Sequence, residues 1–387
     1  MTTCAQIVNR TSVALLLALL LAPLASESQE AQTLSYGLPE DVGMSSSVLR
    51  GALGVYEEAI ERGDLVGAVV LVARQGRIVL HEGLGWRDKE QGLPMERNTL
   101  FRMASNTKPL VATGIAKLVE QGKLDYTDLV RTHMSGWDNY RAGFITIGQL
   151  LSHSSGLRIS SLFLRPLAEN TTLKKEAVRF GSVGASVPPG ETYSYNNPGY
   201  NTLAALVEIA SGQLLEDYLK ATVYGPLKMG DSYNHQTGHD LDGKLDRMGA
   251  VYYERGNDGE WIPAGTPGGP VAYPFVRGSG GMISTAWDYA VFCQMFLNGG
   301  TYDGVKILQP SSVELMTSAK IQTPGGGSYG YGWRLIDDTY GHGGSDGTNA
   351  WIDPEREIIG LVFTQTPRGR FPLDRFRQLV NLSIEER

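Results

Sequence analysis

Ser105 and Lys108 form an S-x-x-K tetrad, which places a hydroxyl and an amine one helical turn apart. The tetrad follows an apolar run and opens a stretch of helical periodicity, so we expect Ser105 at the N-terminus of a helix. A serine hydroxyl is a poor nucleophile until a neighbouring base takes its proton, and a lysine with a lowered pKa can do so. The backbone N–H groups at a helix N-terminus also suit a developing oxyanion. Without further motifs, a capping serine and a solvated lysine would be the simpler interpretation.

Two more motifs follow along the chain. Tyr195 and Asn197 form a Y-x-N tripeptide just before an expected helix. His342, Gly343 and Gly344 form a His-Gly-Gly tripeptide before an expected strand. One short pattern is weak evidence, but several motifs in a fixed order are much more specific.

The order of these motifs resembles that of the serine β-lactamase and penicillin-binding protein family. The resemblance is to the branch of class C β-lactamases, D-alanyl-D-alanine carboxypeptidases and esterases, which carries S-x-x-K, then Y-x-N, then K-T-G or a variant such as H-x-G. Secondary signatures of the family fit residues 150–157, 226–229 and 280–286. The resemblance extends over residues 35–385.

The resemblance implies a role for each polar group of the first two motifs. Ser105 would attack a carbonyl and form an acyl-enzyme, and Lys108 would accept or share its proton. Tyr195, with Lys108 beside it, would act as general base and then return a proton to the leaving group. Asn197 would hydrogen-bond Lys108 and the substrate. Because a phenol has an ordinary pKa near 10, Tyr195 would need nearby cations, which Lys108 and also His342 could supply.

The third motif is implied to complete an oxyanion hole. The backbone N–H groups of Ser105 and Ser345 would bind the oxyanion, and Gly343 and Gly344 would leave no side chain to block an edge-on substrate. Ser345 also lies in a G-x-S-x-G pattern, which is typical of the nucleophile of α/β-hydrolases. That fold needs a histidine after the serine, and His342 is the last histidine of the chain, so this alternative is excluded.

The expected elements place strands at both ends of the chain and helices in the middle. This order predicts an α/β (α+β) fold of the β-lactamase/transpeptidase-like type, with an antiparallel sheet flanked by helices and built from both termini. We expect one serine hydrolase domain over residues 35–385. Its α/β part would comprise residues 35–105 and 275–385, and an inserted, mostly helical part residues 106–274. Residues 229–274 are polar and rich in turns, which indicates a surface insertion.

Composition excludes several classes of protein. Of the 387 residues, 42% are apolar and 19% are charged, which argues against a disordered chain and a multi-span membrane protein. The net charge is −7 and no run is rich in Lys or Arg, so no nucleic-acid partner is expected. Two cysteines, Cys4 and Cys293, exclude a disulfide scaffold. His235 and His239 lack the motifs of a metal site, so we expect no metal and no cofactor.

The first residues are typical of a secretory signal peptide. Arg10 precedes a ten-residue apolar run at residues 13–22, and small residues follow at 25–28. The run is shorter than the roughly 20 apolar residues that a membrane-spanning helix needs. We therefore interpret residues 1–26 as a signal peptide and expect a secreted or periplasmic protein without a stable membrane span after cleavage.

Together these features predict an exported serine hydrolase that cleaves an ester or amide bond of a small molecule or peptide through a Ser105 acyl-enzyme. His342 would be largely neutral at pH 7, so it would recognise an anionic group less well than a lysine at that position. This favours an esterase or a D-amino-acid peptidase over an efficient β-lactamase. Two alternatives remain open: a penicillin-binding sensor without turnover, and an acyltransferase with the same pocket.

Overall fold

The structure is a computed structural model of the 387-residue chain. It describes residues 1–2, 32–157, 167–168, 170–256, 259–264 and 273–385. Apart from Met1 and Thr2, the expected signal peptide lies outside the described residues. The chain divides into two compact units, Met1–Glu30 and Ala31–Arg387, and every element below belongs to the second. Among the described helices, none is long and apolar enough to cross a membrane.

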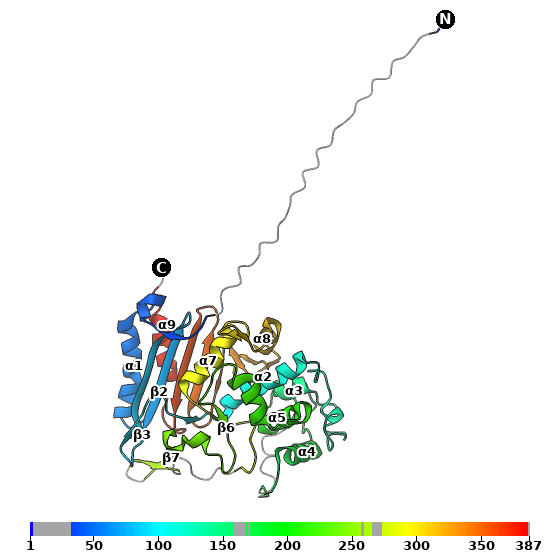
Figure 1. Cartoon of the computed structure of the whole chain (residues 1–387), viewed down its shortest axis with the longest axis horizontal. Helices are drawn as coiled ribbons and strands as arrows, with labels where there is room; N and C mark the ends of the chain where they lie inside the picture. Colours follow the sequence, from blue (N-terminus) through cyan, green and yellow to red (C-terminus); the bar gives the residue numbers. More distant parts are fainter. Residues whose placement is uncertain (3–31, 158–166, 169, 257–258, 265–272, 386–387) are drawn as a thin grey trace. The chain divides into compact units, whose positions relative to one another are not determined.

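Within the described residues a ten-stranded sheet is the centre of the fold (Figure 1). Strands from the two ends of the chain meet in it: β2 (Gly67–Arg74) pairs antiparallel with β17 (Ile358–Thr364). β3 (Arg77–Asp88) continues the sheet on one side, and β16 (Thr348–Asp353) and β15 (Thr339–Gly343) continue it on the other. The remaining strands are β1 (Ser35–Tyr36), β4 (Leu93–Pro94), β12 (Ile321–Gln322), β13 (Ser328–Tyr329) and β14 (Arg334–Ile336).

The sheet is mixed, because β1 runs parallel to β3 while the other pairs are antiparallel. The expected antiparallel sheet is thus correct except at this edge. β1 has only two residues, which pair with Arg77 and Ile78 of β3. Directly after β1, the amide of Gly37 donates a further hydrogen bond to the carbonyl of Ile78. A strand this short has too little periodicity to be recognised in the sequence.

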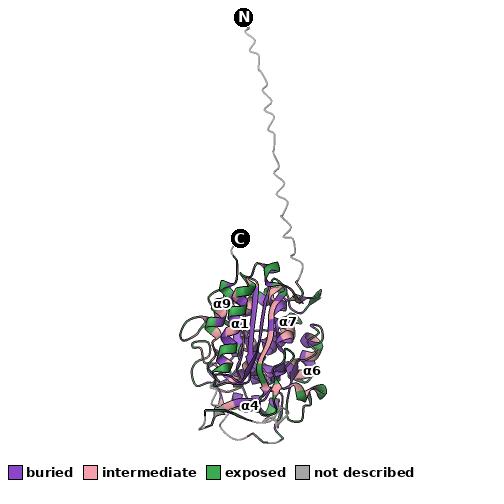
Figure 2. Ribbon diagram, turned by 90° about the vertical axis from the view of Figure 1, so that its left-hand side faces the viewer, coloured by how far each residue is buried: buried purple, intermediate pink, exposed green. Residues whose placement is uncertain are grey.

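Helices cover both faces of the sheet, which explains why its central strands are apolar on both sides. On one face α1 (Ser46–Glu61) and α9 (Leu373–Leu382) pack against each other and against Val70 and Val72 of β2. The opposite face carries α7 (Ala286–Leu297). Figure 2 shows the buried strands between helices whose outer surfaces are exposed. Cys293 is a free, buried cysteine in α7.

The helices of the middle of the chain lie to one side of the sheet (Figure 1). α2 is buried along most of its length and packs against α5. One apolar cluster contains residues of α2 and α5 as well as residues of β2 and β17, so the helical region shares its core with the sheet. The helices of this region, with the short α8 that follows α7, are α2 (Thr107–Glu120), α3 (Ile147–Leu151), α4 (Leu173–Val183), α5 (Asn197–Ser211), α6 (Leu215–Leu219) and α8 (Pro310–Met316).

Residues 229–274, expected as a surface insertion, are fixed to the body of the protein where they are described. β6 pairs with β9, which in turn pairs with β5 next to the S-x-x-K tetrad. Tyr233 and Tyr252 are both about 1% exposed, so the segment contributes to the core. Its strands and their partners are β5 (Phe101–Arg102), β6 (Tyr233–Asn234), β7 (Tyr252–Arg255), β8 (Trp261–Pro263) and β9 (Met282–Ser284); β10 (Thr301–Tyr302) and β11 (Val305–Lys306) form a separate hairpin.

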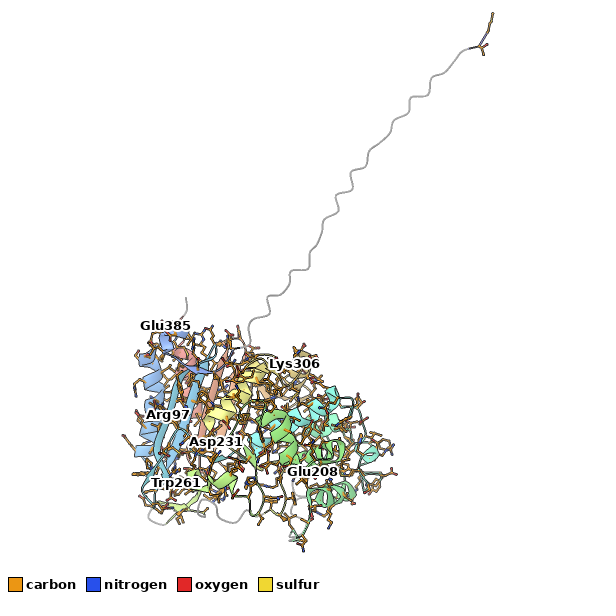
Figure 3. The ribbon with its side chains drawn as sticks, in the orientation of Figure 1. Arg97, Glu208, Asp231, Trp261, Lys306 and Glu385 are labelled. Atoms are coloured by element: carbon orange, nitrogen blue, oxygen red, sulfur yellow. The ribbon has the colours of Figure 1, made fainter. Side chains whose placement is uncertain are left out.

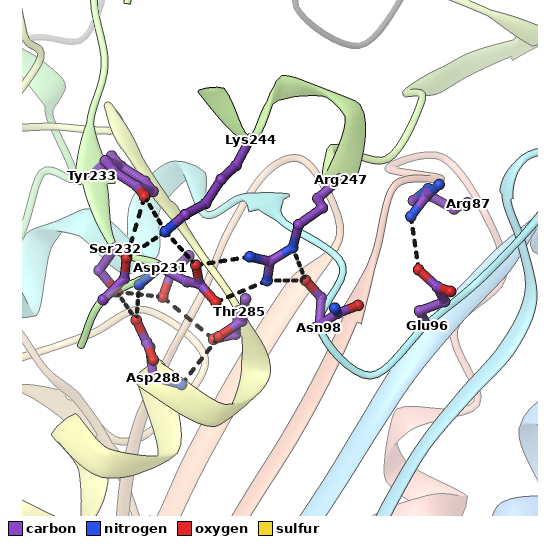
Figure 4. A network of polar contacts seen from close by, with 12 residues as sticks. Arg87, Glu96, Asn98, Asp231, Ser232, Tyr233, Lys244, Arg247, Thr285 and Asp288 are labelled. Carbon is purple, nitrogen blue, oxygen red and sulfur yellow. Dashed lines mark hydrogen bonds and ion pairs between the residues drawn. The ribbon is translucent and has the colours of Figure 1, made fainter. Parts of the chain in front are cut away.

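A polar network attaches this segment to the start of α7 (Figure 4). Asp231 receives two hydrogen bonds from Arg247, both of 2.8 Å, and one of 2.9 Å from Lys244. Its own backbone N–H donates to Asp288 Oδ2 over 2.8 Å, and the Ser232 hydroxyl donates to the same oxygen over 2.9 Å. Burial of Asp288 raises its pKa to about 6, although these hydrogen bonds work in the opposite direction.

The raised pKa of Asp288 predicts a measurable pH dependence of stability. The folded protein binds this proton more tightly than the unfolded chain, so the contribution of Asp288 decreases as pH rises from about 4 to about 7. Asp288→Asn keeps an acceptor oxygen for both donors and removes the titration. The free energy of unfolding of the variant relative to the native protein should therefore increase by about 1–3 kcal/mol between these pH values. Urea titrations at several pH values, with the exposed Asp217→Asn as control, measure this; a constant difference would contradict it.

Candidate active site

Ser105 lies in a tight turn directly before α2, close to the predicted helix N-terminus. The turn is a 3₁₀ helix, Ala104–Asn106, and Ala104 has a φ of +45°, an uncommon value for a residue other than glycine. Side chains fix this backbone: the Thr107 hydroxyl donates to Ala104 O over 2.7 Å, and Asn106 Nδ2 donates to Thr348 Oγ1 over 2.9 Å. The hydroxyl of Ser105 is thereby held at a defined position where β16 meets α2.

Lys108 is fully buried, and its amine contacts three separate segments. Its Nζ lies 3.0 Å from Ser105 Oγ, 3.1 Å from Asn197 Oδ1 and 2.8 Å from the backbone oxygen of Ser279. Burial, together with the neighbouring charge of Arg277, holds the pKa of Lys108 well below its usual value. The two carbonyl oxygens can only accept, so a neutral amine gives them its two N–H groups and keeps its lone pair for the serine hydroxyl.

Tyr195 contacts Ser105 from the other side. Its hydroxyl donates to Ser105 Oγ over 2.7 Å, and Lys108 Nζ lies 4.6 Å from the centre of its ring. Burial raises the pKa of Tyr195 above its usual value, and the positive charge of Arg334 offsets only part of this effect. Tyr195 is therefore a neutral phenol in the resting protein, and it holds a proton beside the serine.

His342 is buried behind Tyr195 and is neutral. Burial lowers the pKa of His342 to about 3, and the charge of Arg334 adds to this effect. Its Nδ1 faces the oxygen of Gly343 at 2.8 Å, so this nitrogen carries the proton, and its Nε2 accepts from the hydroxyl of Tyr329 at 3.0 Å. The expected neutral state is supported, but His342 does not supply the positive charge that the sequence suggested for Tyr195.

The turn after β15 lies beside the serine. A Cβ on Gly344 would collide with Thr348 Oγ1 and the backbone oxygen of Met103, so glycine is needed here for close packing against the turn that carries Ser105. Gly343 is exposed. The amide of Gly344 donates to Thr348 O over 2.6 Å; the Ser345 amide makes no hydrogen bond to the described residues.

A loop that the secondary signatures indicated positions Tyr195. The backbone oxygen of His153 accepts from the amide of Ser194 over 2.8 Å, and its Nδ1 accepts from the amide of Asn196 over 3.3 Å. His153 is fully buried with a φ of +60°. It therefore holds the backbone on both sides of Tyr195.

Arg334 is the functional candidate that the sequence did not reveal. A cavity of about 200 Å³ is lined by Tyr195, Tyr329, Arg334, His342 and Gly343. Arg334 is exposed and takes part in none of the ion pairs found among the described residues. It lies in β14 outside any of the motifs, so only the pairing of β14 with β15 brings it to the site. Ser279 was missed for a similar reason, since its backbone oxygen and not its side chain contacts Lys108.

Known proteins share this architecture. N-acetylmuramyl-L-alanine amidase of Bacillus subtilis is 27% identical over 365 residues, which cover 81% of this chain and 80% of the amidase. The structure of EstCE1, described as a hydrolase with promiscuous acyltransferase activity, has a TM-score of 0.73 at 24% identity and covers 88% of this chain and 99% of its own. The structure of the D-amino acid amidase of Ochrobactrum anthropi has a TM-score of 0.69 at 22% identity, and the match covers 87% of this chain and 99% of the amidase.

The family itself is shown by a match over most of the chain. Residues 54–382 match the beta-lactamase family. The resemblance drawn from the three motifs is confirmed, and so is the fold class, a mixed sheet flanked by helices. The chain therefore belongs to the beta-lactamase family, whose hydrolases act on small-molecule or peptide substrates.

Proposed function

We propose that the protein is an exported serine hydrolase that cleaves an ester or amide bond through an acyl-enzyme on Ser105. One observation carries the proposal: Ser105 Oγ lies within hydrogen-bond distance of both Lys108 Nζ and Tyr195 OH, at 3.0 and 2.7 Å. A buried amine with a free lone pair on one side and a protonated phenol on the other provide a base and an acid for one nucleophile. Export rests on residues 1–26 alone.

The lowered pKa of Lys108 and the raised pKa of Tyr195 support the following order of proton transfers. Lys108 takes the proton of Ser105 as Oγ attacks the carbonyl, and the amides of Ser105 and Ser345 bind the oxyanion. Tyr195 gives its proton to the leaving group. The phenolate that remains faces the newly charged Lys108 and Arg334, which favour the anion. It then takes a proton from the water that hydrolyses the acyl-enzyme, while Lys108 returns its proton to Ser105.

Arg334 favours substrates with an anionic group near the cleaved bond. The sequence suggested weak recognition of anions, because His342 is neutral. The cavity beside Tyr195 nevertheless contains a permanent cation with no ion-pair partner among the described residues. We therefore favour a peptide or amide with a free carboxylate, such as a D-amino-acid peptide, over a neutral ester.

Transfer of the acyl group to another acceptor is a second candidate. The neighbour EstCE1 is described as having promiscuous acyltransferase activity. Both reactions share the acyl-enzyme and differ only in the second nucleophile. A sensor without turnover would instead keep the adduct. Mass spectrometry after addition of penicillin, with assays on p-nitrophenyl butyrate, nitrocefin and D-alanyl p-nitroanilide, separates a stable adduct from product release.

The nucleophile is tested by Ser105→Ala. This variant should lose labelling by a fluorophosphonate probe and at least about 10³-fold in hydrolysis, because it removes the hydroxyl that contacts both Lys108 Nζ and Tyr195 OH. Ser345→Ala is the matched control, since the proposal uses only the backbone of Ser345, and it should label like the native protein. Undiminished labelling of the Ser105 variant would refute the assignment.

The base is tested by Lys108→Met, which keeps the length and apolar contacts of the side chain. We expect a loss of roughly 10²–10⁴-fold in kcat/KM. In the native protein, kcat/KM should rise with pH as Lys108 loses its proton, with a midpoint well below the ordinary lysine value of 10.5. A midpoint near 10.5 would show that Lys108 is charged at neutral pH and does not act there as a resting neutral base. Thermal unfolding of the variant distinguishes loss of the base from loss of the fold.

The cation is tested by Arg334→Gln. A hydrogen-bonded charge pair contributes about 1.5–3 kcal/mol, so kcat/KM for a peptide with a free C-terminal carboxylate should fall about 10- to 100-fold. The same peptide with an amidated C-terminus is the control and should change less than about threefold. An equal loss on both peptides would mean that Arg334 supports the fold or the chemistry and does not recognise a carboxylate.

A further inference from the structure

The hairpin of β7 and β8 is fixed at the ends of β2 and β3. Trp261, labelled in Figure 3, donates its indole N–H to Gly63 O over 2.9 Å. The rings of Trp261 and Tyr252 form a small buried cluster with Val66 and Ala250. These contacts fix the position of the hairpin, so a residue of the hairpin can position a neighbouring loop.

Two adjacent tyrosines of β7, Tyr252 and Tyr253, form hydrogen bonds with different parts of the chain. The register between β7 and β8 shifts between Tyr252 and Glu254, as in a β-bulge. A bulge of this kind changes the direction in which a side chain points. The hydroxyl of Tyr252 accepts from the amide of Lys89 over 2.8 Å and donates to Glu90 Oε2 over 2.7 Å. The hydroxyl of Tyr253 instead donates to Asp346 Oδ1 over 3.1 Å.

Asp346 belongs to the turn that carries the proposed oxyanion amide. The same oxygen, Oδ1, also accepts from the hydroxyl of Ser345 over 3.3 Å. Within the turn the amide of Gly347 donates to Gly344 O over 3.0 Å. Burial and the nearby carboxylate raise the pKa of Tyr253 to about 12, so its phenol keeps the donated proton at neutral pH. The carboxylate of Asp346 is thus held between the hairpin and Ser345.

We infer that Tyr253 is a positioning residue that, through Asp346, holds the turn of residues 344–347 so that the Ser345 amide faces the oxyanion. The inference rests on the proposed function, because it needs an acyl-transfer reaction at Ser105. It gives residues 229–274, expected as a surface insertion, a part in the active site. The hydroxyl of Tyr253 binds Asp346, and Tyr253 is not among the residues that line the cavity beside Tyr195.

The test compares Tyr253→Phe with Tyr252→Phe. Both remove one hydroxyl from the same strand, but only the first releases Asp346. Tyr253→Phe should lower kcat roughly 5- to 20-fold with little change in KM, less than the 10²–10³-fold loss on removing an oxyanion donor outright. Affinity for a boronic acid, which forms a tetrahedral adduct with the serine, should fall by a similar factor. Tyr252→Phe should change kcat and this affinity less than about twofold, even if it lowers the melting temperature.

Two further variants test the route through Asp346. Asp346→Asn keeps the acceptor oxygen and should retain most activity, whereas Asp346→Ala should resemble Tyr253→Phe. The double variant Tyr253→Phe/Asp346→Ala should lose no more than either single variant. Equal effects of the two tyrosine variants, or additive losses in the double variant, would overturn the inference. Labelling of Ser105→Ala would instead overturn the proposed function, so the two failures are distinguishable.

Discussion

The burial of one amine determines the arrangement of the site. Lys108 is inaccessible to water, and its Nζ joins the helix that carries Ser105, the start of α5 at Asn197 and the backbone of Ser279. A charged amine there would have no carboxylate partner within the part of the chain that the structure describes, and Arg277 adds a second positive charge nearby. The neutral form is therefore favoured, and the two carbonyl oxygens leave its lone pair for the serine. Asn201, one turn after Asn197, also binds the amide of Ser279, so α5 fixes two of these contacts.

Burial also keeps the titratable side chains around Lys108 neutral. The rings of four tyrosines lie 4.3–5.9 Å from the ring of His153, and desolvation lowers the pKa of this histidine well below its usual value. Tyr195 and His342 are neutral for the same reason. Two positive charges act on the groups around the serine, Arg277 on Lys108 and Arg334 on Tyr195 and His342, while the carboxylate of Asp346 lies in the neighbouring turn. Neutral donors and these two cations favour an oxyanion or an anionic leaving group, so the resting electrostatics around Lys108 and Tyr195 suit the proposed acyl transfer.

Local spacing predicted the groups that lie close in the sequence, and tertiary pairing supplied the others. Ser105 and Lys108 are one turn apart in a helix, so their contact follows from the sequence. The contact of Lys108 with Asn197 was expected from the family resemblance, not from the spacing of the residues. Arg334 reaches the site only because β14 pairs with β15, and Ser279 contributes a backbone atom that any residue could supply. The neutral state of His342 was expected from the ordinary pKa of histidine, but the further lowering of its pKa depends on how deeply it is buried, which composition and motifs do not encode.

The parts of the site differ in how much the fold constrains them. Lys108, Asn106 and Thr348 are each fully buried, and a change at any of them disturbs the packing of α2 against the sheet. Arg334 is exposed at the start of β14. Its substitution would leave no cavity in the core and would break none of the ion pairs among the described residues. In the proposed mechanism the chemistry is thus carried by buried groups whose replacement is costly, while the proposed selectivity for an anion depends on a surface group whose replacement is not. Under that proposal, substrate preference would change at the edge of the sheet without any change in the buried groups around Ser105.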